Sequence, residues 1–246
     1  MLISHKYKFI FFKSLKTAST STFTFFTPYC LPKNLAQTFD YDERPQKKHL
    51  GFYEEGIVGN KNAIKNIRHV KPKEVKIITD KINPSIWNDY FKFVNIRNPW
   101  DMVVSRYFFN KNYCNLKKNK TEENNAEEIE INTEEINDKE ISFYKFVKKI
   151  YERFISGNEK VTRRDLYTLE EKYFCNFHIR YENIKEDIKE VCYNCNINNF
   201  EIEKLKNFNS EFRPKKNDYR LMYNETTKKL INEMYLIDIE KFKYNF

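Results

Sequence analysis

The sequence predicts an α/β fold, in which a central and mostly parallel sheet lies between flanking helices in a three-layer arrangement. Short runs rich in aromatic and β-branched residues alternate with amphipathic stretches along the chain. The 246 residues are 40% hydrophobic and 17% aromatic, which is enough to bury a substantial core. No internal repeat is visible, and the length fits one domain, so we expect residues 1–246 to form a single domain.

The predicted elements follow the chain in the order strand, helix, strand, strand, helix, with further helices in the C-terminal half. Strands are expected at residues 7–12, 75–79, 91–96 and 174–180. Helices are expected at residues 19–26, 60–69, 86–90, from 98 onward, 141–155, 181–192 and 226–242. The threonine-rich helix at 19–26 has weak intrinsic propensity, so packing or a ligand must support it.

Charge is distributed unevenly along the chain. Residues 121–140 hold nine acidic side chains and one lysine, and we interpret 115–140 as an acidic low-complexity insert within the domain. The formal net charge is +9, and this segment contributes −8, so the other residues carry the difference, +17. That surplus suits an anionic partner such as phosphate, sulfate, nucleic acid or a lipid surface, although a lysine-rich composition bias would also produce it.

The cysteines favour a reducing compartment. Their number is odd, and Cys192 and Cys195 form a C-x-x-C pair without the second pair or nearby histidines that zinc needs. We therefore interpret them as ordinary reduced thiols. No stretch approaches 18 uninterrupted apolar residues and no clear signal peptide is present, so we expect a cytoplasmic protein without a membrane span. A cleaved N-terminal targeting segment is the alternative.

The stretch FKSLKTASTSTF, residues 12–23, combines a strand end, a loop and a helix start. Such a turn presents unpaired backbone N–H groups to an anion. Lys16 adds a mobile positive charge, small residues allow close approach, and hydroxyl donors come from Ser19, Thr20 and Ser21. The first 50 residues contain no glycine, so this is not a Walker A motif. The alternative is a plain polar connection.

The stretch FKFVNIRNPWDMVVSRYFF, residues 91–109, places Arg97 where a strand ends and a helix begins. Asn98 can cap this helix, Pro99 suits its first position, and Ser105 lies two turns into it. Because ligands bind outside the carboxyl ends of strands in open α/β sheets, Arg97 is placed to bind a phosphate. A salt bridge between Arg97 and Asp101 is the alternative.

Together the two stretches resemble the nucleotide-binding segments of PAPS-dependent sulfotransferases, in the carbohydrate-type, sulfotransferase-2-like branch. FKSLKTASTSTF is similar to the 5′-phosphosulfate loop of that family, with Ala18 at the usual glycine and Leu15 at the usual proline. Arg97, Asn98, Pro99 and Ser105 match its 3′-phosphate segment, and the C-terminal IRYENIKEDIKEVC and DIEKFKYNF look like its tail. The resemblance implies a P-loop-NTPase-like version of the α/β fold.

The implied reaction transfers a sulfuryl group in line from 3′-phosphoadenosine-5′-phosphosulfate (PAPS) to an acceptor hydroxyl, with a carbohydrate as the favoured acceptor and no metal. The implied roles are charge stabilisation and acid catalysis for Lys16, and proton abstraction for His69, with His49 and the pair Glu54 and Glu55 as further candidates. The implied nucleotide-binding residues are Lys16, Thr17, Ala18, Ser19, Thr20 and Ser21 for the 5′-phosphate, Arg97 and Ser105 for the 3′-phosphate, and Arg213 and Lys215 as a closing basic loop.

Three other classes stay open. A P-loop-like nucleotide kinase or hydrolase would bind ATP with Mg²⁺, but the missing Walker glycines argue against it. A basic nucleic-acid-binding protein could stack bases on aromatics such as those in YKFIFF, but their alternation within predicted strands is better explained by core packing, so no nucleic acid is expected. An inactive relative that binds PAPS without turnover is the third.

Overall fold

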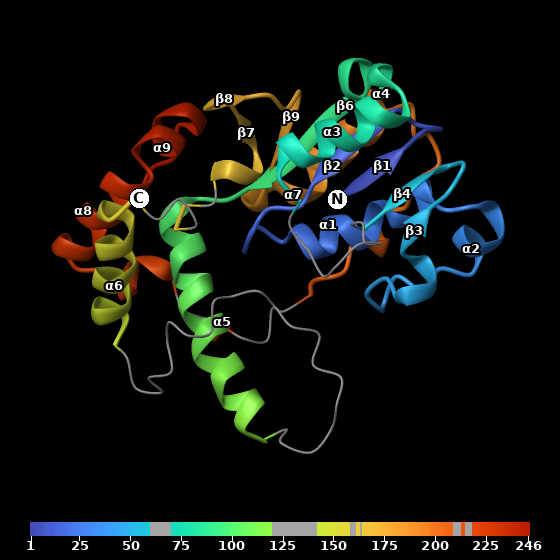
Figure 1. The fold of residues 1–246 in the computed structure, drawn as a ribbon. Coiled ribbons are helices and arrows are strands. Elements are labelled where there is room, and N and C mark those ends of the chain that lie inside the picture. The colour runs from blue at the N-terminus through green and yellow to red at the C-terminus, as the bar shows by residue number, and fades with distance from the viewer. Residues whose placement is uncertain (60–69, 120–141, 158–160, 163, 209–212, 215–217) are drawn as a thin grey trace. The chain divides into compact units, whose positions relative to one another are not determined.

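The computed structural model describes residues 1–59, 70–119, 142–157, 161–162, 164–208, 213–214 and 218–246, with the backbone alone for 112–119. The chain forms two compact units, each assembled from segments that are distant in sequence (Figure 1). The first unit comprises Met1–Ile96 and Arg163–Phe208, and the second comprises Arg97–Thr162 and Asn209–Phe246. The prediction of a single domain over 1–246 stays a prediction.

A six-stranded sheet in the order β3-β4-β1-β2-β6-β9 forms the centre of the first unit. Its strands are β1 (Leu2–Ser4), β2 (Phe9–Phe12), β3 (Gly51–Phe52), β4 (Gly56–Val58), β6 (Phe91–Ile96) and β9 (Phe177–Arg180). β6 pairs in parallel with β2 and β9, whereas β1 and β3 make the antiparallel pairings. Strands β2, β4, β6 and β9 therefore run in one direction, which confirms a mixed α/β arrangement with a mostly parallel sheet.

Helices flank this sheet. Those of the first unit are α1 (Ser19–Phe26), α2 (Lys33–Gln37), α3 (Pro72–Ile82), α4 (Pro84–Asp89) and α7 (Ile184–Asn194), with the short 3₁₀ helices η1 (Thr27–Cys30), η2 (Lys47–His49), η4 (Arg164–Leu166), η5 (Tyr181–Asn183) and η6 (Ile202–Lys204). A separate hairpin is formed by β7 (Thr168–Leu169) and β8 (Lys172–Tyr173).

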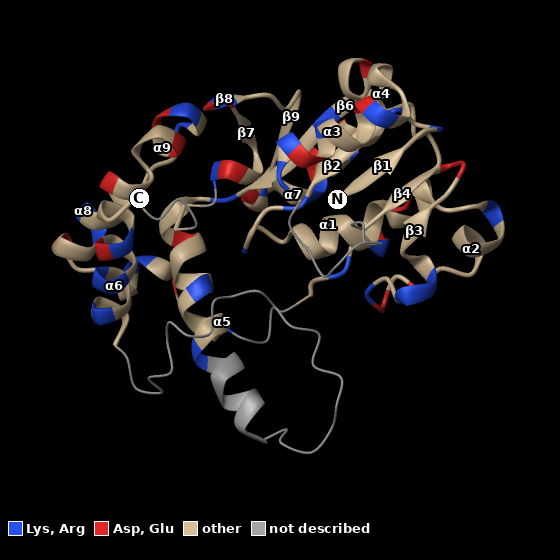
Figure 2. Ribbon diagram, in the orientation of Figure 1, with Lys and Arg blue, Asp and Glu red and all other residues tan. Residues whose placement is uncertain are grey.

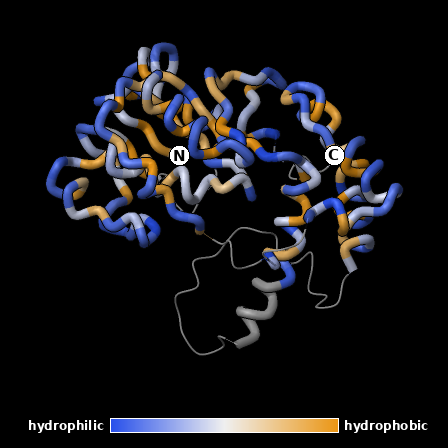
Figure 3. The backbone as a smooth tube through the Cα atoms, turned by 180° about the vertical axis from the view of Figure 1, so that it is seen from behind, coloured by the Kyte–Doolittle hydropathy of each residue, from blue (hydrophilic) through white to orange (hydrophobic). Residues whose placement is uncertain are grey.

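Successive strand residues point to opposite faces of the sheet, and both faces are covered. On one face the ring of Phe9 lies 5.5 Å from that of Phe26 in α1, and Ile188 of α7 joins the same core cluster. On the other face the ring of Phe12 lies 6.2 Å from that of Trp87 in α4. Strands β2 and β6 are buried on both sides, apart from the first residue of β6, and are accordingly rich in apolar residues. Hydrophobic stretches of the backbone are orange in Figure 3.

The strand predicted at 75–79 is wrong, because these residues belong to helix α3. Their β-branched composition suggested a strand, but the buried positions are Pro72, Val75 and Thr79, three and four residues apart, which is the spacing of one helical face. The start of the helix is fixed by Pro72 at its first turn and by the carboxylate of Glu74, which accepts the Lys71 N–H at 2.9 Å.

Other expectations agree more closely with the structure. The strand predicted at 91–96 is β6, and the helices predicted at 19–26 and 181–192 correspond to α1 and α7. The predicted helix at 226–242 is two helices that meet at Tyr235, and the strand β1 was not foreseen. The predicted helix at 60–69 and most of the predicted insert, residues 120–140, lie outside the described residues.

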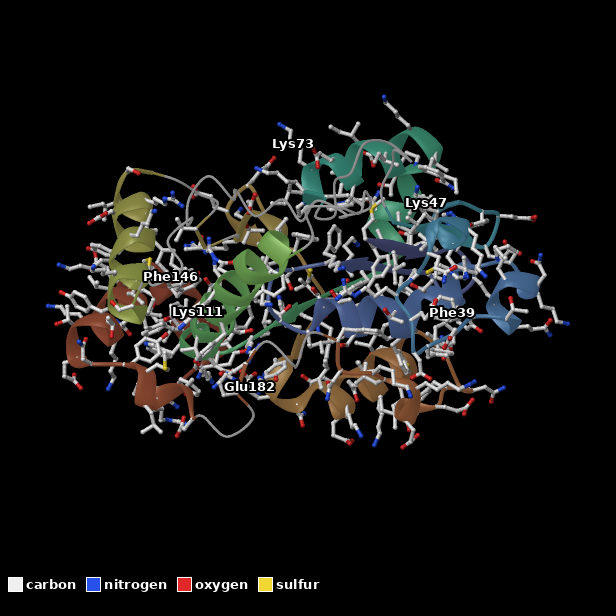
Figure 4. The ribbon with its side chains drawn as sticks, turned by 90° about the horizontal axis from the view of Figure 1, so that it is seen from below. Phe39, Lys47, Lys73, Lys111, Phe146 and Glu182 are labelled. Carbon is white, nitrogen blue, oxygen red and sulfur yellow. The ribbon has the colours of Figure 1, made fainter. Side chains whose placement is uncertain are left out.

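Helices make up the described elements of the second unit: α5 (Pro99–Asn119), α6 (Phe143–Ile155), η8 (Tyr219–Met222), α8 (Glu225–Met234) and α9 (Leu236–Phe242). Phe146 of α6, labelled in Figure 4, is fully buried, and its ring lies 5.5 Å from that of Tyr107 in α5. Val103, Ile150 and Ile231 extend this core. The amphipathic spacing that predicted a helix at 141–155 reflects this packing.

The structure also bears on two predictions from the sequence, the absence of a membrane-spanning helix and the reduced state of the cysteines. Every helix within the described ranges is too short or too polar to cross a bilayer. Cys192 and Cys195 are buried free thiols at the end of α7, and burial raises the pKa of each to about 12. Both are therefore protonated at neutral pH, which suits packing rather than thiolate chemistry.

Candidate anion-binding sites

The segment that joins β2 to α1, residues 13–18, is here named the Lys16 loop. Lys16 and Ala18 both have left-handed backbone conformations, with φ of 57° and 58°. Alternation of left- and right-handed residues turns successive backbone N–H groups toward a common concave side, a geometry that binds anions. The loop thus adopts at Ala18 the left-handed conformation that a glycine would favour.

Helix α1 begins directly after this loop, with Ala18 as its N-cap. Alanine has no side-chain acceptor, and the helix itself provides no acceptor for the N–H groups of its first turn, at Ser19, Thr20 and Ser21. Helix α1 also contains no charged residue, as Figure 2 shows, so no carboxylate of its own offsets the positive end of its dipole. These N–H groups are suited to an anion.

The hydroxyl groups around the Lys16 loop mostly face inward. Ser14 Oγ donates its one proton to the Asn95 carbonyl oxygen at 2.6 Å. The 2.7 Å contact between Ser14 Oγ and Thr17 Oγ1 must therefore use the Thr17 proton. The Ser19 hydroxyl donates to the Ser14 carbonyl oxygen. The hydroxyl protons of Thr17 and Ser19, both predicted to bind phosphate, are thus used in hydrogen bonds within the protein.

Two further predicted ligands differ in their exposure. Ser21 is buried, and its Oγ accepts the Phe208 N–H at 3.3 Å. Thr20 is half-buried, as are Lys16 and Ala18. Of the hydroxyls predicted to bind the 5′-phosphate, that of Thr20 is therefore the one best placed for a ligand, together with the backbone N–H groups.

In the second unit, Arg97 lies in an ion cluster with Asp101 and Arg213, here named the Asp101 cluster. Asp101 Oδ2 accepts a hydrogen bond from Arg97 Nε at 2.7 Å and lies 2.6 Å from Arg97 Nη2, while Arg213 Nη1 donates to Asp101 Oδ1. Arg97 and Asp101 are only 9% and 8% exposed. Two guanidinium groups thus share one carboxylate.

The start of α5 holds this cluster in place. Asn98 Oδ1 accepts the Trp100 N–H at 3.1 Å, so Asn98 caps the helix as predicted. Its Nδ2 donates to the Asn245 carbonyl oxygen at 2.8 Å. Ser105 is half-buried one turn after Asp101, on the same side of α5. The alternative interpretation of Arg97, a salt bridge to Asp101, is confirmed, and Arg213 adds a second cation to this pair.

Candidate bases are less well defined by the structure. His69 and Lys215 lie outside the described residues. His49 is buried, its Nδ1 accepts the Gln46 N–H at 3.0 Å, and its ring lies 5.1 Å from that of Phe39, labelled in Figure 4. Burial lowers the pKa of His49, and the nearby Lys48 lowers it further, so this imidazole is neutral at pH 7. Within the described ranges, no three His, Cys, Asp or Glu side chains gather as metal ligands.

The structure brings the predicted residues together in two groups. Lys16, Thr17, Ala18, Ser19, Thr20 and Ser21 belong to the first unit, whereas Arg97, Ser105 and Arg213 belong to the second. Sequence reasoning missed the link between Asp101 and Arg213, because 112 residues separate them and no local pattern connects them. It also missed Ser14 and Asn95, although an asparagine inside the apolar strand FKFVNI was an available signal.

No protein-family model, curated protein or solved structure matches this chain. The resemblance to sulfotransferases therefore rests on the residues of the two stretches and of the C-terminal segments, and the geometry around the two stretches is the remaining evidence on function.

Proposed function

We propose that this chain is a sulfotransferase that moves the sulfuryl group of PAPS to an acceptor hydroxyl, with a carbohydrate as the first acceptor class to test. The observation that carries the proposal is the turn from β2 through the Lys16 loop into α1. It combines two left-handed residues, an N-cap without a side-chain acceptor, and a lysine. This combination suits a doubly charged phosphate ester better than a plain connection.

The 5′ end of the donor is assigned to the Lys16 loop. The N–H groups of Ser19, Thr20 and Ser21 would bind the 5′-phosphate, and the hydroxyl of Thr20 would add one donor. Thr17 and Ser19 contribute by shaping the loop through their bonds to Ser14, because their hydroxyl protons are already used there. Ala18 contributes its backbone only.

The 3′-phosphate is assigned to Arg97, Arg213 and Ser105. The Asp101 cluster supports this assignment, because it holds two arginines from distant parts of the sequence around one carboxylate. Strands β2 and β6 are parallel neighbours, so their carboxyl ends lie at the same edge of the sheet. Arg97 is the residue that follows β6 in the sequence. In open α/β sheets that edge is where nucleotides bind.

In the proposed reaction the acceptor hydroxyl oxygen forms a bond to sulfur while the bond from sulfur to the bridging phosphate oxygen breaks. The electron pair of the broken bond moves to the phosphate, where negative charge grows. Lys16 would stabilise this charge and protonate or hydrogen-bond the leaving oxygen. The acceptor proton passes to a base, for which His69 is the first candidate and His49 the second. The products are adenosine 3′,5′-bisphosphate and a sulfate ester.

The proposal is tested by measuring nucleotide affinity with titration calorimetry, without added metal. Adenosine 3′,5′-bisphosphate should bind at least about tenfold more tightly than ADP or ATP, because one charged contact contributes roughly 1.5–3 kcal/mol. Arg97→Ala should abolish this preference, and Arg97→Lys should reduce it, because lysine keeps the charge but loses the planar fork.

Arg220→Ala is the matched control for the arginine. Arg220 belongs to the same unit but is half exposed, and it pairs with Asp218 at 3.3 Å. This variant should keep the preference for the 3′-phosphate. Equal affinity of the unaltered chain for adenosine 3′,5′-bisphosphate and ATP would refute the sulfotransferase proposal. Transfer of labelled sulfate from PAPS to a panel of glycans then identifies the acceptor.

A further inference from the structure

Asn95 is an unusual residue for its position in the first unit. It lies in β6, a central strand of the sheet, and is fully buried. Phe93, two residues earlier on the same face, packs against Phe11 and Phe26. An aliphatic residue would fit this environment without the cost of burying an amide.

The polar groups of Asn95 contact both sides of the Lys16 loop. Its backbone carbonyl oxygen accepts a hydrogen bond from the hydroxyl of Ser14, at the start of the loop, at 2.6 Å. Its side-chain Nδ2 donates to Thr22 Oγ1, in the first turns of α1, at 2.9 Å. The Thr22 N–H in turn donates to the Ala18 carbonyl oxygen at 3.2 Å. A single residue of β6 is therefore linked to the start of the loop and, through Thr22, to its end.

The amide of Asn95 is only partly satisfied. Within the described part of the chain its Oδ1 is buried without a hydrogen-bond partner. An unsatisfied buried acceptor costs stability, so folding alone gives no reason to place an asparagine here. Such a cost is expected where a side chain positions a functional segment.

We propose that Asn95 is a positioning residue for the Lys16 loop, which fixes the loop and the first turn of α1 relative to the carboxyl end of β6. It would touch neither nucleotide nor acceptor. The side chain of Asn95 would act through its hydrogen bond to Thr22, which positions the N–H groups at the start of α1. The hydrogen bond from the Ser14 hydroxyl to the backbone carbonyl oxygen of Asn95 would hold the start of the loop. The consequence for catalysis rests on the proposed sulfotransferase function, whereas the consequence for loop order does not.

Asn95→Leu is the main test variant, because leucine has nearly the same shape and lacks the amide. Hydrogen exchange of the amides at residues 14–22 should become at least about fivefold faster, as expected for the loss of one buried hydrogen bond. Thr22→Val removes the acceptor instead and should give the same change. In the double variant the two effects should not add, because both remove the same bond.

Asn110→Leu is the matched control. Asn110 is also a buried asparagine with an Oδ1 that lacks a hydrogen-bond partner among the described residues, but it lies in α5 of the second unit. This variant should leave exchange at residues 14–22 unchanged. If Asn95→Leu lowers the melting temperature while exchange of the loop amides stays at the level of Asn110→Leu, Asn95 is a packing residue and the inference is wrong. If Asn95→Leu does not fold, Thr22→Val takes its place, and unchanged exchange at residues 14–22 in that variant would equally show that the inference is wrong.

Kinetics separate this inference from the proposed function. If the unaltered chain transfers sulfate, Asn95→Leu should lower kcat by about tenfold or more, because small misplacement of a catalytic group is costly, with a smaller change in KM. An unaltered kcat would overturn the catalytic part of the inference. Failure of the unaltered chain to bind adenosine 3′,5′-bisphosphate would instead refute the sulfotransferase proposal, and the exchange experiment would still test the positioning role.

Discussion

The Lys16 loop and the Asp101 cluster are two candidate anion sites built on opposite principles. The loop relies on backbone N–H groups, a helix start and hydroxyls bonded to one another, with lysine as its cation. The cluster relies on buried Arg97 and half-buried Arg213, joined by one carboxylate. The loop is made from consecutive residues, whereas the cluster joins residues 97 and 213. The loop should therefore tolerate changes of side chain better than the cluster does.

This difference has an energetic basis. Contacts from backbone dipoles are distributed over several groups, so no single side chain dominates them. A buried ion cluster depends on each of its members, because removing one leaves an uncompensated charge away from water. Substitutions at the two sites should thus differ in kind, with stability responding at the cluster and turnover responding at the loop.

The largest expected effect is that of Asp101→Ala on stability. This change removes the carboxylate that buried Arg97 shares with half-buried Arg213, so the free energy of unfolding should fall by about 3–5 kcal/mol. Urea denaturation measures the loss. Glu152→Ala, at an exposed position of α6, should change stability by less than about 0.5 kcal/mol. A loss for Asp101→Ala as small as that of the control would mean that the arginines do not depend on this carboxylate.

The next largest effect is expected for Lys16→Ala on turnover. Removal of a group that stabilises the leaving oxygen should lower kcat by about 10²–10³-fold, with little change in stability or in affinity for adenosine 3′,5′-bisphosphate. Labelled-sulfate transfer and calorimetry measure the two quantities. Lys33→Ala, an exposed lysine of α2, serves as the control and should leave both unchanged. If Lys16→Ala weakened binding as strongly as Arg97→Ala while kcat stayed constant, the division of roles between the two sites would be wrong.

The same contrast explains how far the sequence could be used for prediction. The Lys16 loop, β6 and the capped start of α5 follow from adjacent residues, so local rules on apolar runs, capping and helix starts found them. The strand predicted at 75–79 failed because composition there favours strand, while burial follows a helical period that depends on tertiary packing. Composition and packing disagree in α3, and packing prevails.

Long-range pairings were beyond local rules. The second arginine that contacts Asp101 comes from a segment 112 residues later, and the hydroxyl proton of Thr17 is directed by Ser14, which is itself hydrogen-bonded to Asn95 in strand β6. Ser19 was predicted to be a phosphate donor because a hydroxyl group is chemically able to fill that role, and Thr17 because the resemblance to sulfotransferases implies it. Only the fold determines whether their protons are available, and here both are used internally.

The smallest expected effect is that of Ala18→Gly, which tests the backbone character of the Lys16 loop. Glycine should relieve roughly 1–2 kcal/mol of left-handed strain. It should lose about 0.4–1 kcal/mol through a more flexible unfolded chain, so a net gain of roughly 0.5–1 kcal/mol in the free energy of unfolding is expected. Lys243→Gly, at a left-handed residue with φ of 55° at the end of α9, should give a similar gain in the second unit.

Urea denaturation compares the two glycine variants, and calorimetry adds the affinity for adenosine 3′,5′-bisphosphate. Ala18→Gly should keep or modestly improve this affinity, because the N–H groups stay in place when only the Cβ atom is lost. Lys243→Gly should not change it. A destabilised Ala18→Gly variant beside a stabilised Lys243→Gly variant would show that Ala18 is not left-handed in solution. The loop would then lack the concave backbone on which its comparison with the Asp101 cluster depends.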